Sequence, residues 1–162
     1  MDDKIYYTEH QKFTQWWLWL LILSLNLFFI VNLFKSIGVD HTDTPDTKIL
    51  FIVSVLNILL TVLFFSIRLD TRIKKSGIEV RLFPFRRNYK HFYWDKIAKI
   101  YTRVYKPILE YGGWGVRYGS KGKALNISGN KGLQIEFTTG KKLLIGTQNP
   151  EEINRILKQL NK

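Results

Sequence analysis

The chain has 162 residues, and its 25 lysine and arginine side chains against 13 aspartate and glutamate side chains give a net charge of +12 with neutral histidines. It has no cysteine, which excludes a disulfide scaffold, a thiolate nucleophile and a zinc site with cysteine ligands. Aromatic residues make up 15% of the chain and are spread along it, so a long disordered region is not expected. Two stretches, 16–34 and 49–67, contain no charged residue at all.

The two uncharged stretches are each 19 residues long. A helix of that length spans roughly 28 Å, which is close to the ~30 Å hydrocarbon core of a bilayer. Neither stretch has the polar face of a soluble helix, and the residues before 16–34 lack the basic start of a cleaved signal peptide. We therefore expect a transmembrane hairpin, with the first helix at 16–34 and the second at 49–67.

The uneven distribution of basic residues predicts the orientation of this hairpin. Of the 25 lysines and arginines, 21 lie in 68–162, whereas the connecting segment 35–48 has a net charge of −1. Because basic residues next to membrane helices stay in the cytoplasm, we expect 1–15 to be a cytoplasmic N-terminal segment, 35–48 an extracytoplasmic loop and 68–75 a cytoplasmic basic linker. Both termini would then be cytoplasmic.

Residues at the ends of the two stretches are suited to the membrane interface. Trp16, Trp17 and Trp19 open the first stretch, and Arg68 and Arg72 follow the second. Tryptophan and basic side chains are enriched where a helix leaves the hydrocarbon. We expect these five residues to anchor the hairpin at the interface.

Polar residues inside the two stretches are few. If the helices are antiparallel, Asn26 and Asn57 lie at the same depth near the middle of the membrane. An unpaired amide is costly in hydrocarbon, so we expect an interhelical hydrogen bond between them, worth about 0.6–2 kcal/mol. A transport pathway would need ionisable groups, and the stretches contain none, which argues against a transporter or a channel.

From about residue 76 the pattern changes to that of short strands. Ile78, Val80 and Leu82 alternate with polar residues, and further alternating runs follow, separated by turns rich in glycine. Near the end, Asn149 and Pro150 signal the start of a helix with one apolar stripe. We expect 76–162 to be an α+β domain of about seven antiparallel strands in a curled barrel, closed by a C-terminal helix.

Four runs in this region form a pattern with a defined spacing: GIE at 77–79, FPF at 83–85, YWDKI at 93–97 and GTQNPEE at 146–152. In these runs the chain resembles the bacterial pleckstrin-homology-like (PH-like) domains, some of which follow a transmembrane hairpin. The resemblance implies a PH-like domain on a multi-pass protein of the bacterial inner membrane. It implies no catalytic residue, because the family shares none. Eukaryotic relatives of the fold often bind lipid head groups through basic residues of the first hairpin loop.

The first hairpin loop of this chain is a candidate for contact with lipid or another anion. Arg86 and Arg87 follow the turn at Pro84, and Lys90 lies just beyond them. The guanidinium fork of arginine suits phosphate, so this loop is expected to contact anionic head groups.

A second candidate lies in the glycine-rich segment 105–123. Its basic residues Arg117, Lys121 and Lys123 would surround an anion if the glycines form a nest of backbone amides. The glycines are equally typical of hairpin turns, and in that case the segment has only a structural role.

No pattern indicates catalysis, a metal site or a cofactor, because the three histidines are scattered and no phosphate-binding glycine loop has the required spacing. The basic charge would also suit nucleic acid, or solubility alone, but the short tether behind the second stretch holds the domain at the membrane, which argues against nucleic acid. The expected function is a membrane-anchored, non-catalytic binding module for a protein partner or for anionic lipid of the inner leaflet. The alternatives are a subunit of a larger membrane complex, whose hairpin packs on partner helices, and a membrane-tethered enzyme.

Overall fold

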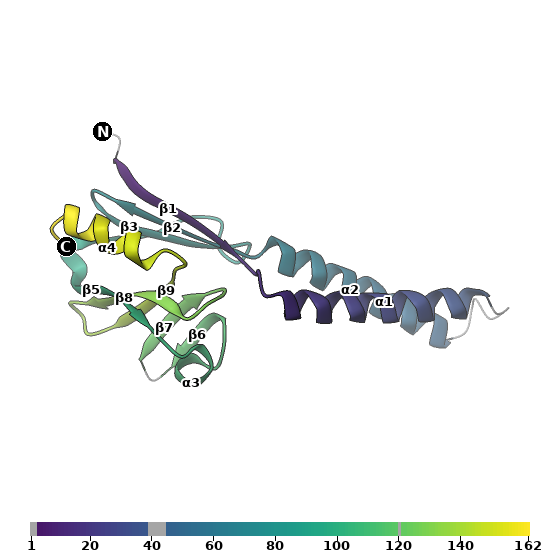
Figure 1. Ribbon diagram of the computed structural model, residues 1–162. Helices are drawn as coiled ribbons and strands as arrows, with labels where there is room; N and C mark the ends of the chain where they lie inside the picture. Colours follow the sequence, from purple (N-terminus) through teal and green to yellow (C-terminus); the bar gives the residue numbers. More distant parts are fainter. Residues whose placement is uncertain (1–2, 39–44, 120) are drawn as a thin grey trace. The chain divides into compact units, whose positions relative to one another are not determined.

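The computed structural model describes residues 3–38, 45–119 and 121–162 (Figure 1). The chain divides into two compact units. The helical unit comprises Thr14–Ser66, and the globular unit is assembled from Met1–Phe13 together with Ile67–Lys162. The N-terminal segment therefore belongs to the same unit as the C-terminal part of the chain.

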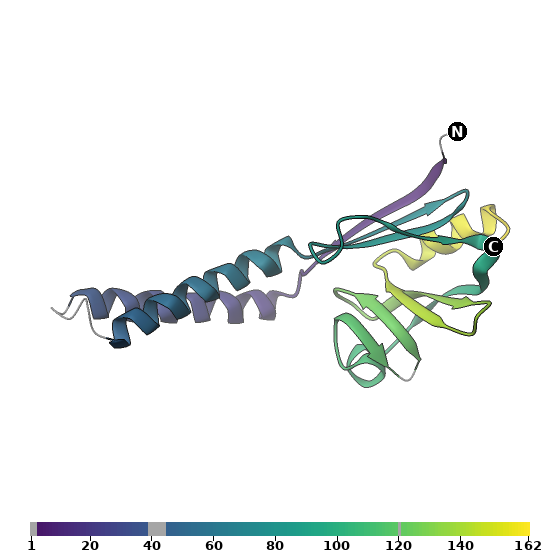
Figure 2. The ribbon, with the colours of Figure 1, turned by 180° about the vertical axis from the view of Figure 1, so that it is seen from behind.

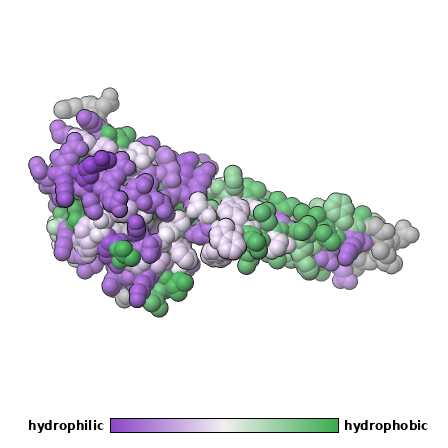
Figure 3. Space-filling view, viewed as in Figure 1, coloured by the Kyte–Doolittle hydropathy of each residue, from purple (hydrophilic) through white to green (hydrophobic). Residues whose placement is uncertain are grey.

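The helical unit consists of α1 (Trp16–Gly38) and α2 (Pro45–Ser66). Within these helices, Trp16–Ile37 and Asp46–Ser66 are long and apolar enough to cross a membrane. Most of their large apolar side chains are exposed, and Figure 3 shows a largely hydrophobic surface along this unit. A helix that is apolar on all sides is typical of a membrane span.

Both helices extend into the segment 35–48, which was expected to be a loop. α1 continues through Lys35, and α2 begins at Pro45, where proline at the first helical position and Asp46 in the first turn favour a helix start. The centre of the expected extracytoplasmic loop, 39–44, lies outside the described residues.

Contacts at both ends of the helix pair show that α1 and α2 are antiparallel, as expected. The hydroxyl oxygens of Ser36 and Thr47 are 2.6 Å apart. At the opposite end, the rings of Trp19 and Phe65 meet edge-on with their centroids 6.1 Å apart. These contacts fix which residues of the two helices lie at the same height.

The expected hydrogen bond between Asn26 and Asn57 is not formed. Asn26 Nδ2 donates to Thr61 Oγ1 and to the Ile22 carbonyl, both at 2.8 Å. Thr61 donates in turn to the Asn57 carbonyl, and Asn57 Nδ2 has no hydrogen-bond partner among the described residues. The threonine hydroxyl replaces the asparagine because it accepts from α1 while donating to its own helix.

The globular unit contains two β-sheets. Sheet A is antiparallel in the order β1-β2-β3-β4, and Figures 1 and 2 show β1 beside β2 within it. Its strands are β1 (Ile5–Lys12), β2 (Arg68–Lys74), β3 (Gly77–Phe83) and β4 (Lys90–Tyr93). Sheet B has the order β5-β8-β9-β7-β6. Its strands are β5 (Ile97–Val104), β6 (Gly115–Gly119), β7 (Gly122–Asn126), β8 (Lys131–Phe137) and β9 (Lys142–Gly146).

Three short elements complete the globular unit. The single turn η1 (Trp94–Lys96) joins sheet A to sheet B, and α3 (Pro107–Tyr111) precedes β6. The C-terminal helix α4 (Pro150–Gln159) contacts β1, β5 and β8, so it touches both sheets. Its presence and its start at Pro150 confirm the helix expected from the sequence.

The sheets differ from the expected curled barrel of about seven antiparallel strands. The described strands form two separate sheets, and β7 and β9 are parallel. The expected N-terminal segment 1–15 contains β1, and the expected basic linker 68–75 contains β2. The sequence does not indicate these two strands because β1 buries the polar residues Glu9 and Gln11, and because the arginines of β2 look like a charged linker.

The core of the globular unit is built from the inner faces of both sheets and from α4. Its largest fully buried aliphatic residues are Leu69, Ile73, Ile78 and Val80 in sheet A, Leu133, Ile135, Leu144 and Ile145 in sheet B, and Ile153 in α4. Burying one such side chain contributes about 1.5–3 kcal/mol. The apolar stripe predicted for the C-terminal helix is thus buried against the sheets.

Glu9 joins β1 to the segment between β9 and α4. Its carboxylate is buried and accepts from the Tyr7 hydroxyl at 2.7 Å and from Gln11 Nε2 at 3.1 Å. It also accepts from the Thr147 hydroxyl and the Gln148 backbone N–H, both at 2.7 Å. Burial and the neighbouring carboxylate raise the pKa of Tyr7, so its hydroxyl stays a donor at neutral pH. All four partners are therefore donors facing one acceptor.

We predict that Glu9→Ala loosens β1. The substitution leaves several buried donors without an acceptor, each at a cost of roughly 1–3 kcal/mol, so a local loss of about 3 kcal/mol is expected. Amide hydrogen exchange in strand β1, measured on the full chain in neutral detergent, should accelerate by about a hundredfold. Glu151→Ala, at an exposed position of α4, is the matched control. Equal exchange of β1 in the two variants would show that Glu9 does not hold the strand.

Candidate functional site

A cavity of about 930 Å³ opens between the two sheets of the globular unit. On the side of sheet A it is lined by β4 and η1, and on the side of sheet B by the β6–β7 hairpin, β9 and the turn between β8 and β9. The rings of Phe92 and Phe137 meet across the sheets with centroids 5.3 Å apart, and Leu125 and Leu143 also line the cavity. Part of its inner surface is therefore apolar.

The charged lining of this cavity is entirely basic. Its six lysines are Lys90, Lys96, Lys121, Lys123, Lys141 and Lys142, and no aspartate or glutamate is among the described residues that line it. We call it the lysine cavity. Lys121 and Lys142 have acidic partners beyond the lining, at 3.7 Å and 3.4 Å respectively. The other four form no ion pair with any residue that the structure describes.

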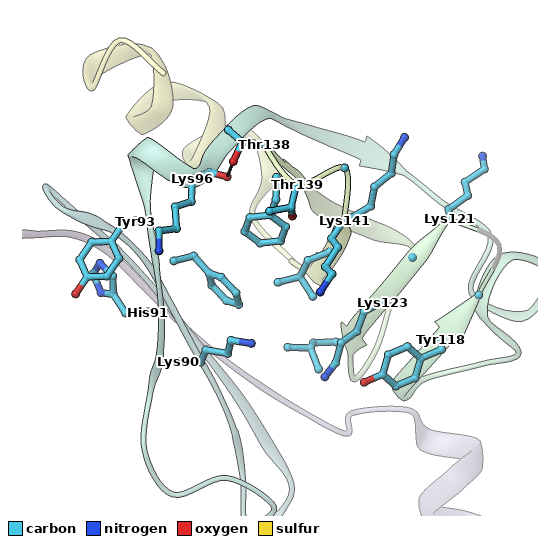
Figure 4. A pocket seen from close by; sticks show the side chains of 18 residues that line it. Lys90, His91, Tyr93, Lys96, Tyr118, Lys121, Lys123, Thr138, Thr139 and Lys141 are labelled. Atoms are coloured by element: carbon cyan, nitrogen blue, oxygen red, sulfur yellow. Dashed lines mark hydrogen bonds between the residues drawn. The ribbon is translucent and has the colours of Figure 1, made fainter.

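The free lysines come from separate elements of the fold. Figure 4 shows that Lys90, Lys123 and Lys141 converge on one part of the hollow, that Lys96 lies at its edge and that Lys121 extends away. Lys90 Nζ lies 5.1 Å from the centroid of the Phe92 ring. Such cation–π contacts hold an ammonium group against an aromatic wall while leaving its hydrogens available.

The position of β7, which carries Lys123, depends on Gly122. This glycine has a φ of 100°, and a Cβ built on it would lie 2.5 Å from the Lys142 carbonyl oxygen. Any other residue would therefore be strained and would push the hairpin away from β9. Lys123 Nζ lies 5.2 Å from the ring centroid of Tyr118, which is 76% exposed at the mouth of the cavity.

The lysine cavity unites only part of the residues predicted from sequence. It contains Lys90 from the first predicted segment and Lys121 and Lys123 from the second. Arg117 does not line it, since its Nε donates to the Trp114 carbonyl at 3.0 Å. Sequence reasoning missed Lys96, Lys141 and Lys142. The pairing of β9 with β7 and β8 brings Lys141 and Lys142 to the cavity. Lys96 lies in η1, and its carbonyl accepts from the Thr138 backbone N–H at 3.0 Å, beside the turn between β8 and β9.

Arg86 and Arg87 lie elsewhere, in the exposed loop between β3 and β4. The register of sheet A pairs Lys12 with Arg68 and Arg68 with Phe83. The loop therefore begins at the end of the sheet from which the chain continues into α1 and out of α2. Phe85, the last residue of the FPF run, is 66% exposed in the same loop.

The expected interface anchors Arg68 and Arg72 lie on β2, where both contact neighbours within the globular unit. Arg68 Nε is 2.9 Å from an oxygen of the buried Asp70 carboxylate, and Arg81 binds its other oxygen. Arg72 and Arg81 lie over the ring of Tyr89, with guanidinium carbons 4.2 and 4.4 Å from its centroid. This cluster stiffens the outer face of sheet A beside the loop of Arg86.

The expected interface anchors of α1 lie in its first turn. Trp16 and Trp17 are 75% and 49% exposed, and Trp19 contacts Phe65 of α2. All three are therefore grouped at the end of α1 that follows β1. Tryptophans at the end of a membrane-spanning helix are typical of an aromatic belt at the level of the head groups, and their role as anchors stays a prediction.

The described part of the chain holds no group of three histidine, aspartate or glutamate side chains that could bind a metal ion. His91 contacts Glu79 at 3.3 Å and Ser76 at 3.3 Å, on the outer face of sheet A. No protein-family model, no curated protein and no solved structure matches this chain.

Asp70 is the buried acceptor of the cluster on sheet A. Burial raises the pKa of its carboxyl, but hydrogen bonds from His10 and Arg81 and the charge of Arg68 outweigh this effect, so that the pKa is lowered from 3.8. A carboxyl whose pKa is lower in the folded state contributes stability above the pKa of the unfolded chain. That contribution is lost as the pH falls from about 4 through the lowered value.

We predict that Asp70→Asn destabilises the globular unit by about 1–3 kcal/mol at neutral pH, because charged hydrogen bonds are lost. The difference in free energy of unfolding between the parent and the variant should shrink as the pH falls from about 4 through the lowered pKa, because the parent carboxyl loses its charge over this range. Urea unfolding of the full chain in neutral detergent, at several pH values, measures the free energy of unfolding of both proteins. The exposed Asp95→Asn is the control. If the difference in free energy of unfolding stayed constant down to a pH of about 2, the lowered pKa of Asp70 would not explain the stability.

Proposed function

We propose that the chain is a membrane-anchored, non-catalytic binding module of the bacterial inner membrane, whose basic PH-like globular unit contacts anionic lipid of the inner leaflet. The two apolar helices supply the anchor. Residues 68–162 carry 21 basic against 7 acidic side chains. Anionic lipids attract each basic residue near the surface by about 1 kcal/mol.

The observation that carries this proposal is the register of sheet A. Arg68 follows the end of α2 by two residues and pairs with Phe83, from which the loop of Phe85, Arg86 and Arg87 departs. Extended residues span about 3.3–3.6 Å each, and paired strands lie about 5 Å apart, so Phe85 lies within roughly 20 Å of the end of α2. If α2 crosses the membrane, this loop is held at the interface by the chain itself.

The chemistry of the loop fits an interface. Phe85 offers an exposed aromatic side chain, which is favoured at the level of the head groups. Arg86 and Arg87 offer two guanidinium groups that bind phosphate with paired hydrogen bonds. The combination of one apolar side chain and two cations is suited to a surface of anionic lipid.

The pairing of β1 with β2 supports the orientation proposed for the hairpin. Neighbouring strands of one sheet lie on one side of the membrane, so two spans between them must cross and return. The excess of basic residues behind α2 favours the cytoplasm for that side. Both termini are cytoplasmic in this arrangement.

The lipid contact is tested with Phe85→Cys, which gives the cysteine-free chain a single site for an environment-sensitive fluorophore. In nanodiscs that contain phosphatidylglycerol, we expect blue-shifted emission and quenching by lipids with a shallow spin label. Adding Arg86→Ala and Arg87→Ala should weaken both signals, and high salt should reduce the difference, since charge attraction is screened over about 8–10 Å.

The matched control keeps the loop intact and removes two exposed lysines elsewhere, with Lys131→Ala and Lys158→Ala. It changes the net charge by the same amount, so its signals should stay close to those of the parent. An equal effect of the two double variants would mean that diffuse charge, and not the loop, governs the contact. A fluorophore that is water-exposed in every lipid would overturn the proposal.

The orientation predicts different labelling of two single cysteines in cells enclosed only by the membrane that holds the protein. Thr42→Cys, whose position lies outside the described residues, should react with an impermeant thiol reagent in intact cells. Lys158→Cys, on the exposed side of α4, should react only after permeabilisation. The opposite labelling pattern would refute the proposed orientation.

A further inference from the structure

We propose that the lysine cavity is a binding site for an anionic amphiphile, a molecule with a phosphate-like head and an apolar chain. This proposal deepens the proposed function and rests on it, because a protein held at a membrane is surrounded by such molecules. It assigns a class of ligand to a defined site. Binding at this site is distinct from the general attraction between a basic protein and a membrane.

The head of the ligand is inferred from the lysines that have no acidic partner. Lys90, Lys123 and Lys141 converge from β4, β7 and the β8–β9 turn, and none forms an ion pair with a described residue. Three positive charges therefore face one part of the hollow with no acidic partner among the described residues. An anion with several oxygens, such as a phosphate monoester, would accept hydrogen bonds from these ammonium groups and supply the missing negative charge.

The apolar part of the ligand is inferred from the walls and the size of the cavity. Phe92 and Phe137 from the two sheets lie together, and Leu125 and Leu143 add aliphatic surface. A volume of about 930 Å³ is at the upper end of small-molecule sites, which span about 300–1,000 Å³. Inorganic phosphate would fill little of it, whereas a head group with a chain would cover both the lysines and the apolar walls.

The cavity is also built to keep its shape without a ligand. Gly122 permits the close approach of β7 to Lys142, and the aromatic rings under Lys90 and Lys123 hold two of the ammonium groups in place. A site that is formed in advance binds with less loss of side-chain freedom. Strands of both sheets and two turns contribute to it, so it differs from the loop of Arg86 and Arg87.

Lysine acetylation at low conversion, followed by peptide mass spectrometry, tests the proposal on the full chain in phosphatidylcholine nanodiscs. Octyl phosphate is the soluble probe, with octyl maltoside and inorganic phosphate as controls at the same concentration. At a probe concentration about tenfold above its Kd, acetylation of Lys90, Lys123 and Lys141 should slow by about tenfold. Lys99, Lys131 and Lys158, which are exposed outside the cavity, are internal controls and should keep their rates.

A second arm distinguishes the source of the amphiphile. Nanodiscs with phosphatidylglycerol, and no added probe, should protect the same three lysines if the ligand is a membrane lipid. Protection by either source supports the site. Equal protection by inorganic phosphate or by octyl maltoside, equal protection of the control lysines, or no protection from either source would overturn it. Fluorescence at position 85 reports the loop contact separately, so failure of the cavity and failure of the proposed function are distinguishable.

Discussion

The pairing of β1 with β2 is the constraint on which the rest of the structure depends. The two strands are separated in sequence by the whole helical unit, yet Lys12 pairs with Arg68 at the base of the hairpin. This pairing makes the N-terminal residues part of the globular unit and places both helix connections at one end of sheet A. Because β3 continues the same register, the loop of Arg86 and Arg87 begins at that end as well.

A single buried carboxylate connects this pairing to the rest of the globular unit. Glu9 points from β1 toward the segment that joins β9 to α4, where Thr147 and Gln148 donate to it. A buried acceptor that is surrounded by donors specifies one arrangement of the chain, since any shift of β1 would leave several groups unpaired. The contact thus links β1 of sheet A with the segment that follows β9 of sheet B.

The sequence indicates the elements that have a strong hydrophobic pattern. The two apolar helices and the stripe of α4 were predictable, because a long uncharged run and a helical period are local signals. β1 and β2 were not, because Glu9 is buried where an apolar residue is expected and Arg68 and Arg72 resemble a linker. The lysine cavity was only partly predictable. Lys90 and Lys123 were indicated by local patterns, but the approach of Lys141 to Lys123 depends on the parallel pairing of β7 with β9.

The split of the globular unit by the hairpin has a consequence for biosynthesis. During synthesis β1 emerges first, and its partner β2 emerges only after both helices have been made. The first strand must therefore wait unpaired until the hairpin is complete. If only one of the helices were inserted, the two strands would lie on opposite faces of the bilayer and sheet A could not close. If both helices span a membrane, as proposed, closure of sheet A therefore requires that both of them are inserted.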